Sequence, residues 1–503
     1  MKKPIVLTVI DGLGLRKKEQ GNAYKQAETP VLDNLLSEYP NSVLGAAGEA
    51  VGLPEGQIGN SEVGHLNIGA GEIVYTGLSL VQKALDDGTY ADNEAFAKSI
   101  KFAKDNNGTI QIVGMLSPGG VHSLEEHLFA LLKSLHSKKV KDVTVHVFTD
   151  GRDVSPRSAK PSIEKLMKLL KEFGYKLGSI GGRLYGMDRD QNFDKTEVAY
   201  EAMQGTAVLK FDDVYKFLEN QYKVENHNDE FIDVAVNSDA LVKFYSEGDS
   251  VIFFNFRPDR AQQLAHLIVG SKKYTFKPKN QIKNTQMTIM MKYEGIDNVN
   301  VAYESWEVKN TIGSTISKAG LKQLRIAETQ KYAHVTFFMD GGIDIKYPGL
   351  DRILVDSIKV DNFADAPLMS AKKITDELIK VLNKYDIVIM NYANPDMVGH
   401  TGNLEAAKIA VNFLDQQIGR LKTEVDKLGG TMFITADHGN AEITEDEDGN
   451  PATKHTTSDV FLISTDKDLK LKDGVLADVT PTILDYMGIE KPKSMTHESL
   501  IKK

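Results

Sequence analysis

The sequence predicts an α/β protein with two α/β domains, each built on a mainly parallel β-sheet. Short apolar runs rich in β-branched residues alternate with amphipathic helical stretches along the chain. Continuous apolar strands of this kind are typical of parallel sheets that helices cover on both faces. Polar residues follow the strand ends, where open α/β sheets bind their ligands. These residues are acidic near both chain ends and basic in the middle.

The first predicted strand is IVLTVI at 5–10, which ends in Asp11 and Gly12. The other predicted strands share its apolar character and are bounded by turn residues. They lie at 109–116, 143–148, 250–256, 334–339, 386–392 and 431–436. Apolar residues at helical spacing predict helices between them, at 123–138, 370–384 and 403–429.

Ser61 lies in QIGNSEVGHLNIGAG, residues 57–71, among four glycines. The stretch is too rich in glycine for a good helix and too irregular for a strand, so it is predicted to be a loop. A serine hydroxyl is a weak nucleophile until its proton is removed. A divalent ion lowers the pKa of an oxygen bound to it. The pattern therefore favours Ser61 as a metal-activated nucleophile, and the alternative is an incidental serine in a surface turn.

Composition narrows the classes of function. The chain has 503 residues and a net charge of −10, which disfavours non-specific binding to nucleic acid. An anionic substrate would need cations gathered in one site. The sequence has no cysteine, which excludes disulfides and thiolate metal sites. No stretch reaches the roughly 20 apolar residues of a membrane span, so a cytoplasmic protein is expected.

Acidic residues and histidines follow three of the predicted strands. Asp396 and His400 are four residues apart and would share one face of a helix. Each residue alone is a weak signal, because Asp-Gly is usually a turn and a lone histidine is usually packed or exposed. Carboxyl ends of parallel strands meet at one edge of a sheet, so together the residues predict a divalent cation site. The candidate ligands are Asp11, Asp396, His400, Asp437, His438 and His455.

A second group of strand ends carries mostly basic residues. Its members are His122, Arg152, Asp153, Arg183, Arg189, Arg257 and Arg260. The separation of acidic from basic ends predicts one domain made of residues 1–75 and 306–503. A second domain is predicted as an insertion at 76–305.

Ten motifs, in order over nearly the whole chain, resemble the cofactor-independent phosphoglycerate mutase family, a branch of the alkaline phosphatase superfamily. They are VIDGLG, GQIGNSEVGHLNIGAG, VHSLEEHL, TDGRDVSP, IGGRLYGMDRD, FFNFRPDRAQQL, AETQKYAHVTFF, NYANPDMVGHTG, TADHGNAE and KHTTSDV. The resemblance implies that Ser61 is transiently phosphorylated. It implies one Mn²⁺ held by Asp11, Ser61, Asp437 and His438, and a second held by Asp396, His400 and His455. It adds Lys331 to the substrate-binding set of His122, Arg152, Asp153, Arg183, Arg189, Arg257 and Arg260.

The resemblance also implies the reaction. The family interconverts 3-phosphoglycerate and 2-phosphoglycerate in glycolysis without 2,3-bisphosphoglycerate. Its members have a phosphatase domain built from both chain ends and an inserted transferase domain, and they are expected to be monomers. In this chemistry Asp153 is the expected general acid and later the general base. Zn²⁺ or Co²⁺ would accept the same ligands as Mn²⁺.

Two segments depart from the family pattern, namely Asp340 in FFMDGG and the stretch DNFADAPLMSA, which includes residues 361–368. Two alternative functions remain open. One is a metal-dependent phosphatase or phosphopentomutase on the same core, and the other is a non-catalytic metal- or phosphate-binding protein. A mutase must keep water from the phosphoserine, so the arginine-bearing domain is expected to close as a lid, with hinges near 75 and 306.

Overall fold

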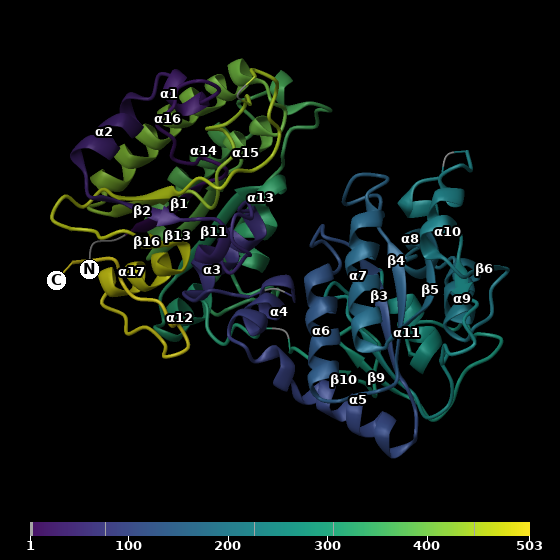
Figure 1. The fold of residues 1–503 in the computed structure, drawn as a ribbon. Helices are drawn as coiled ribbons and strands as arrows, with labels where there is room; N and C mark the ends of the chain where they lie inside the picture. Colours follow the sequence, from purple (N-terminus) through teal and green to yellow (C-terminus); the bar gives the residue numbers. More distant parts are fainter. Residues whose placement is uncertain (1–3, 76, 226, 305, 447, 503) are drawn as a thin grey trace. The chain divides into compact units, whose positions relative to one another are not determined.

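The computed structural model describes residues 4–75, 77–225, 227–304, 306–446 and 448–502 (Figure 1). These residues form two compact units, one of Met1–Tyr75 with Trp306–Lys503 and the other of Thr76–Ser305. Within the described residues, each unit holds one eight-stranded sheet and its own hydrophobic core. The predicted α/β class is therefore confirmed. None of the described helices combines the length and the apolar character that a membrane crossing requires.

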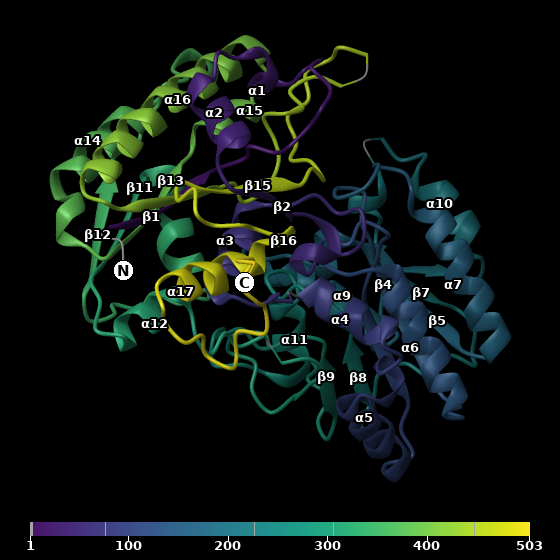
Figure 2. The ribbon, with the colours of Figure 1, turned by 90° about the vertical axis from the view of Figure 1, so that its left-hand side faces the viewer.

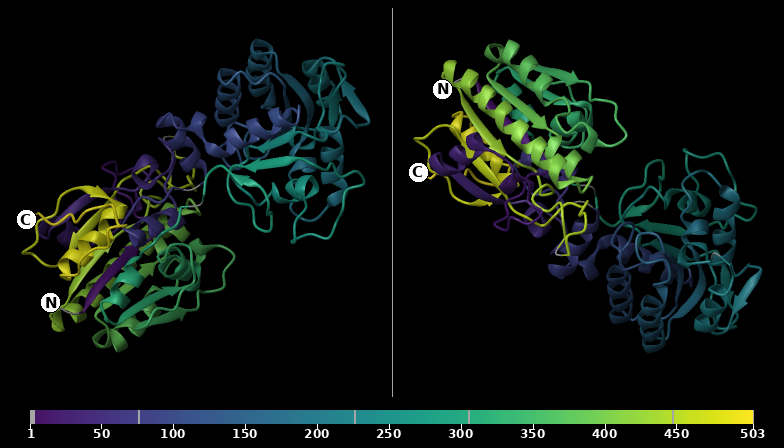
Figure 3. Two further views of the ribbon diagram at one scale, coloured as in Figure 1. Left: turned by 90° about the horizontal axis from the view of Figure 1, so that it is seen from below. Right: turned by 90° about the horizontal axis from the view of Figure 1, so that it is seen from above.

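The first unit is built around a sheet in which seven described strands run in one direction and β15 runs against them. In spatial order the strands are β12 (Leu350–Val355), β11 (Gln323–Glu328), β13 (Ile387–Tyr392), β1 (Ile5–Ile10), β14 (Thr431–Thr435), β15 (Val460–Ser464), β2 (Asn41–Gly45) and β16 (Gly474–Val475). Figure 3 shows how the purple N-terminal segment and the green and yellow C-terminal segments combine in this unit. The two ends of the sequence therefore share one sheet.

Helices cover both faces of the first sheet (Figure 2). On one face lie α1 (Ala23–Gln26), α2 (Pro30–Glu38), α14 (Ala371–Val381), α15 (Asn394–Gly399) and α16 (Leu404–Lys427). The others are α3 (Ser61–Ala70), α12 (Ile312–Lys318), α13 (Thr329–Ala333) and α17 (Val479–Tyr486). The long helix α16 begins where the Asn403 side chain accepts a hydrogen bond from the Ala406 amide, which satisfies one of the free amides of its first turn. Its apolar residues are spaced for one buried face.

The prediction of a loop at 57–71 is wrong, because residues 61–70 form the helix α3. Its glycines allow neighbouring segments to lie close to the helix backbone, and they are not needed for backbone flexibility. A β-carbon at Gly64 would lie 2.5 Å from the carbonyl oxygen of Asp437, and one at Gly69 would collide with that of Met339. The helix therefore packs its backbone directly against the segments beside it, and Ser61 is fixed in its first turn.

The strand predicted at 334–339 is also wrong. His334–Phe338 forms a π-helical turn that continues α13, although the β-branched and aromatic residues of this segment favour a strand. Within this turn the buried residues are the neighbours Val335 and Thr336, which does not follow the alternation of a half-exposed strand. The neighbouring strand β11 contains the fully buried Arg325. Because this charged residue interrupts the apolar run, the sequence pattern did not predict the strand.

Asp340, one of the two departures from the family pattern, is the buried partner of Arg325. Its Oδ1 lies 3.3 Å from Arg325 NH2, and both side chains are fully buried. Burial raises the pKa of Asp340, while Arg325 and Arg352 oppose that shift. The departure is thus explained inside the core rather than at the surface.

Replacing Asp340 by alanine should destabilise the first unit by about 3–5 kcal/mol, because it leaves Arg325 as an unpaired buried charge. Trp306, the single tryptophan of the chain, lies in this unit and reports its unfolding in urea by fluorescence. Asp344→Ala is the matched control, because Asp344 pairs with Arg352 but is 71% exposed. Its loss should leave the stability nearly unchanged, because solvent screens an exposed ion pair. Equal destabilisation by the two substitutions would contradict the assignment.

The second unit also has an eight-stranded sheet. Neighbouring strands in it are parallel, except that β7 runs antiparallel to β5. In spatial order its strands are β10 (Asn300–Val301), β9 (Gln286–Ile289), β8 (Ser250–Phe253), β3 (Ile110–Leu116), β4 (Val143–Thr149), β5 (Lys176–Gly182), β7 (Ala235–Asn237) and β6 (Leu209–Phe211). Its helices are α4 (Gly77–Asp86), α5 (Glu94–Asp105), α6 (Glu125–Ser137), α7 (Ala159–Phe173), α8 (Arg183–Gly186), α9 (Phe193–Met203), α10 (Val214–Gln221) and α11 (Gln262–Val269). The central strands β3 and β4 are buried along their whole length.

His146 on β4 gives the second unit a stability that depends on pH. It is fully buried, its Nε2 donates to Gln111 Oε1 at 3.0 Å, and its Nδ1 accepts from Ser179 Oγ at 2.8 Å. Burial lowers its pKa from 6.5 to about 3. Between these values the unfolded chain binds a proton that the folded chain excludes, so acidification favours unfolding.

The contribution of His146 to the free energy of unfolding is therefore complete above pH 6.5. It is lost as the pH falls towards 3, by up to about 1.4 kcal/mol per pH unit. Urea unfolding of the wild type and of His146→Gln at pH 7 and pH 5 checks this. The stability difference between the two proteins should shrink at pH 5. A difference that stays constant would show that His146 titrates normally in the folded protein.

Candidate active site

Three adjacent parallel strands bring the residues that follow them to one point of the first sheet. The strands are β13, β1 and β14, in that order, and they lead to Asp396, Asp11 and Asp437. Ser61 reaches the same point from the first turn of α3. These side chains are all buried, with Ser61 only 4% exposed. The predicted convergence of the acidic strand ends is what the structure shows.

Ser61 lies against the first group of candidate ligands. Its Oγ is 3.1 Å from Asp11 Oδ1 and 2.8 Å from His438 Nε2. Asp437 lies beside them, with its Oδ2 3.6 Å from the same nitrogen of His438. Potential ligand atoms of Asp11, Asp437 and His438 lie within 4.8 Å of one another. The hydroxyl oxygen of Ser61 is thus directed at a compact set of carboxylates and imidazole.

A second group forms around Asp396 Oδ1. His400 Nε2 lies 3.3 Å and His455 Nε2 lies 3.0 Å from that oxygen, and the two nitrogens are 3.0 Å apart. The Nδ1 atoms of these rings lie 2.8 Å from Thr453 O and 2.9 Å from Gly59 O. Each Nδ1 must donate to its carbonyl oxygen, so in the neutral rings both Nε2 atoms present lone pairs. Three acceptors then converge, and a cation held among them satisfies all three.

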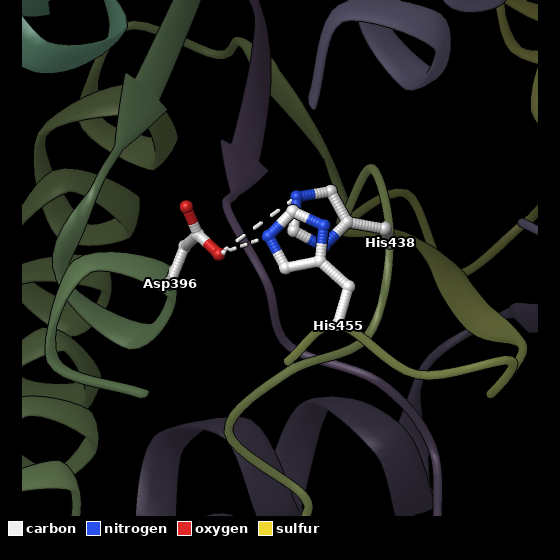
Figure 4. Close-up of side chains that lie close together, drawn as sticks. All are labelled: Asp396, His438 and His455. Atoms are coloured by element: carbon white, nitrogen blue, oxygen red, sulfur yellow. Dashed lines mark ion pairs between the residues drawn. The ribbon is translucent and has the colours of Figure 1, made fainter. Parts of the chain in front are cut away.

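His438 connects the two groups. Figure 4 shows it with His455, both directed towards the carboxylate of Asp396, and the two rings stack with their centroids 3.9 Å apart. Burial would lower the pKa of His438, but Asp437, Asp11 and Asp396 raise it to about 10. The pocket therefore stabilises positive charge at this point strongly. Histidine nitrogens and carboxylate oxygens without thiolates are a donor set that fits divalent ions such as Mn²⁺, Zn²⁺ and Co²⁺.

Lys331 extends from α13 into the same cluster. Its Nζ lies 2.7 Å from Asp11 Oδ1, 2.7 Å from Asp396 Oδ2 and 2.6 Å from Ser61 Oγ. Burial opposes its charge, but the neighbouring carboxylates raise its pKa above the ordinary value. The family resemblance grouped Lys331 with substrate-binding residues that otherwise belong to the second unit. The structure places it beside Ser61 in the first unit.

The candidate substrate residues of the second unit also lie at neighbouring strand ends. Arg183 is buried, and its NH1 lies 2.6 Å from both Asp150 Oδ1 and Asp153 Oδ2. Arg152 is more than half exposed and lies 3.5 Å from Glu230. His122 Nε2 lies 3.8 Å from Asp153 Oδ2. Asp153 therefore lies between the guanidinium group of Arg183 and the imidazole of His122.

Asp259 holds several of the remaining cations, and sequence reasoning did not single it out. Its carboxylate accepts from Arg257 Nε at 3.1 Å and Arg189 NH1 at 3.1 Å, and its Oδ1 lies 3.4 Å from His122 Nδ1. Burial opposes this arrangement, but His122 and Arg257 lower the pKa of Asp259 far below its usual range. Its position between the two arginines of RPDR was the available signal.

Arg260 differs from the other arginines, because its NH1 donates to the carbonyl oxygen of Met187 at 3.1 Å. Its pKa is lowered by burial and by the nearby Arg189, Arg183 and Arg152. It lines a cavity of about 140 Å³, and Arg152 and Arg183 line the same cavity. Lys195 also lines this cavity, together with the acidic residues Asp188, Asp190 and Glu230, so the lining carries charges of both signs.

Three buried polar residues near Ser61 were not predicted from the sequence. His65 Nδ1 lies 3.1 Å from Asp437 Oδ2, and Asn391 Nδ2 donates to Asp11 Oδ2 at 2.7 Å. Asn440 Nδ2 donates to Asp396 Oδ1 at 2.8 Å. His65 lies within the motif around Ser61, and Asn440 follows His438 closely in the chain. Only the folded structure shows that they contact the carboxylates.

Comparison with known proteins agrees with this geometry. A family model described as "Metalloenzyme superfamily" matches residues 3–491. The 2,3-bisphosphoglycerate-independent phosphoglycerate mutase of Mycoplasmopsis pulmonis is 56% identical over 100% of this chain and 99% of its own length. The enzyme of the same name from Metamycoplasma hominis is 57% identical over 99% of this chain and 100% of its own.

A solved structure is similar over the whole length. The crystal structure of Leishmania mexicana phosphoglycerate mutase at low cobalt concentration covers 100% of this chain and 98% of its own, at 28% identity and a TM-score of 0.64. A metalloenzyme family agrees with the two sets of residues in the first unit that could hold a metal ion, which are Asp11, Asp437 and His438, and Asp396, His438 and His455. The chain therefore belongs to the 2,3-bisphosphoglycerate-independent phosphoglycerate mutase family of isomerases, within the metalloenzyme superfamily.

Proposed function

We propose that the chain interconverts 3-phosphoglycerate and 2-phosphoglycerate in glycolysis through a phosphoserine at Ser61, with two Mn²⁺ ions per chain. The observation that carries the proposal is the position of Ser61 Oγ, which is buried within 3.1 Å of Asp11, His438 and Lys331. The names of the relatives supply the substrate class, and the ligand groups supply the chemistry.

The residues around Ser61 fit the proposed ions. Asp11, Ser61, Asp437 and His438 would hold one, and Asp396, His400 and His455 the other. Bound there, a divalent ion would lower the pKa of a coordinated hydroxyl and neutralise phosphoryl charge. Zn²⁺ or Co²⁺ would suit the same ligands.

The protein's own groups then perform the transfer. Ser61 occupies the first turn of α3, where the free amides and the helix dipole favour a phosphoryl group on its oxygen. Lys331, already 2.6 Å from that oxygen, is positioned to bind the transferred phosphoryl group. Phosphoryl transfer depends mainly on such positioning and charge neutralisation.

The second unit would handle the glycerate. Asp153 protonates the departing glycerate oxygen and later removes the proton from the hydroxyl that attacks the phosphoserine. Arg257 and Arg260 bind the carboxylate of the glycerate, since guanidinium groups match carboxylates with paired hydrogen bonds. In this proposal the inserted unit is the substrate-binding transferase domain, and the unit built from both chain ends is the phosphatase-like domain.

The alternative is a metal-dependent phosphatase or phosphopentomutase that uses the same core. The arginine cluster around Asp259 and Arg260 favours the mutase, because simple hydrolysis has no need of a glycerate clamp. Phosphorus NMR of 3-phosphoglycerate incubated with the Mn²⁺-loaded protein tests the choice. Formation of 2-phosphoglycerate supports the mutase, whereas accumulation of free phosphate alone would show a phosphatase. We further propose a cytoplasmic monomer that binds no nucleic acid, and light scattering and a nucleic-acid binding assay check the last two points.

A further inference from the structure

We infer that His65 and Asn391 are positioning residues that hold Asp437 and Asp11 in the orientation needed to bind a divalent ion. Neither residue is assigned to the ligand set, and both are fully buried. His65 lies on α3, one helical turn after Ser61, and Asn391 lies near the end of β13. The inference rests on the proposed metal site and names the residues that orient its carboxylates.

The contacts of His65 fix its tautomer. Its Nδ1 lies 2.9 Å from the backbone oxygen of Ser61 and 3.1 Å from Asp437 Oδ2. Both oxygens are acceptors, so the hydrogen of the neutral ring must be on Nδ1. That hydrogen is donated to the Ser61 carbonyl oxygen, and the same nitrogen lies 3.1 Å from Asp437 Oδ2, a buried atom that accepts no hydrogen bond from the described residues.

Asn391 completes the link from the other side. Its Nδ2 lies 3.1 Å from His65 Nε2 and 2.7 Å from Asp11 Oδ2. Because Nδ1 of His65 carries the hydrogen, Nε2 is an acceptor and one hydrogen of the amide satisfies it. The second amide hydrogen is donated to Asp11. The opposite orientation of the amide would place its oxygen against two acceptors, so the contacts determine the orientation.

One imidazole in contact with Asp437 and one amide bonded to Asp11 thus lie between the two carboxylates. Asp11 Oδ2 is held by Asn391, which leaves Asp11 Oδ1 facing Ser61 Oγ. The other oxygen of Asp437 accepts from the Gly12 amide at 3.2 Å. Two buried carboxylates this close to each other would otherwise turn apart to reduce their repulsion. Partners of this kind orient metal ligands, and their loss typically reduces metal affinity by about 10- to 100-fold.

The effect should be confined to one of the two ligand groups. The group of Asp396, His400 and His455 has its own supports, which are Asn440 Nδ2, Thr453 O and Gly59 O. Loss of His65 should therefore weaken the binding of one Mn²⁺ ion, while the other ion keeps its wild-type affinity.

The test is a titration of the full-length, metal-stripped protein with Mn²⁺, in which electron paramagnetic resonance measures the free ion. His65→Ala should bind one of two ions about 10- to 100-fold more weakly. His65→Asn places an amide nitrogen where Nδ1 lies, so it should retain most of the affinity. His65→Gln reaches only the position of Nε2 and should behave like alanine. Asn391→Asp, which puts a third carboxylate beside Asp11, should also weaken this ion.

His334→Phe is the matched control. The His334 ring packs edge-on against His65, with the centroids 5.4 Å apart. Phenylalanine keeps this ring contact without nitrogen atoms, so Mn²⁺ affinity should remain unchanged. If His334→Phe weakens the ion as much as His65→Ala does, the effect comes from packing and the inference is overturned.

The remaining outcomes separate this inference from the proposed function. If the wild type binds two ions and folded His65→Ala binds both with equal affinity to it, the positioning role alone is refuted. If the wild type does not bind two ions, the proposed function and the inference fail together. Should His65→Ala not fold, the Asn and Gln variants decide, and equal loss in the two overturns the inference.

Discussion

Replacing Ser61 by alanine should abolish mutase turnover, with a loss of at least about 10⁴-fold in kcat. The proposed reaction passes through a bond between phosphorus and Ser61 Oγ, and no other hydroxyl can take its place. Ser61 Oγ is held by Asp11, His438 and Lys331 in a buried pocket. If water took its place as the nucleophile, the phosphate formed would not be covalently bound to the protein for the second transfer. A coupled assay for 2-phosphoglycerate measures the loss.

Ser42 provides the control for this substitution. It is a serine of β2 in the same unit, it is also 4% exposed, and its hydroxyl has no hydrogen-bond partner among the described residues. Ser42→Ala should retain normal turnover. Intact-mass measurement after incubation with substrate should detect one added phosphoryl group on the wild type and none on Ser61→Ala. Turnover by Ser61→Ala within tenfold of the wild type would rule out the phosphoserine route.

The position of the candidate site could be predicted because it depends on few geometric facts. Apolar strands buried on both faces pack in parallel, and their carboxyl ends meet. Asp11 and Asp437 each follow such a strand directly, so their convergence needed only the correct order of strands. The pairing of Ile5 with both Ile387 and Thr431 supplies that order.

Local structure was harder to predict where tertiary contacts override residue preference. Gly64 and Gly69 argue against a helix by their intrinsic propensity, yet α3 needs them because larger residues would collide with the backbone at Asp437 and Met339. The aromatic segment after Lys331 has the composition of a strand but turns as a π-helix. In α3 the deciding contacts come from residues distant in the sequence.

The supporting residues were hidden for a related reason. A buried histidine such as His65 is, by residue type alone, more often a packed core residue than part of a site. Its role follows from the side of the ring that faces Asp437, and Asp259 is recognisable only once His122 and Arg189 are seen around it. Sequence patterns identify groups that follow strands, whereas groups that orient them are found in space.

Removing divalent metal should abolish turnover, by at least about 10³-fold, and added Mn²⁺ should restore it. The Lys331 ammonium lies between Asp11 and Asp396 and contacts Ser61 Oγ. Burial opposes the charge of Lys331, but the neighbouring carboxylates raise its pKa, which makes this lysine a poor base for Ser61. Burial opposes the charge of His438, but Asp437, Asp11 and Asp396 raise its pKa, so this imidazole is also a poor base for Ser61.

The chain's own residues therefore hold Ser61 in place without deprotonating it, and this is why the metal is indispensable in the proposed reaction. Dialysis against a chelator, metal analysis and a coupled assay during re-addition of Mn²⁺ measure the dependence. Circular dichroism before and after chelation separates loss of chemistry from loss of fold. Because Lys331 compensates two carboxylates, the metal-free protein should remain folded. Full activity in folded protein shown to be free of metal would mean that Ser61 is activated by a side chain, and the role given to the ligand groups would be wrong.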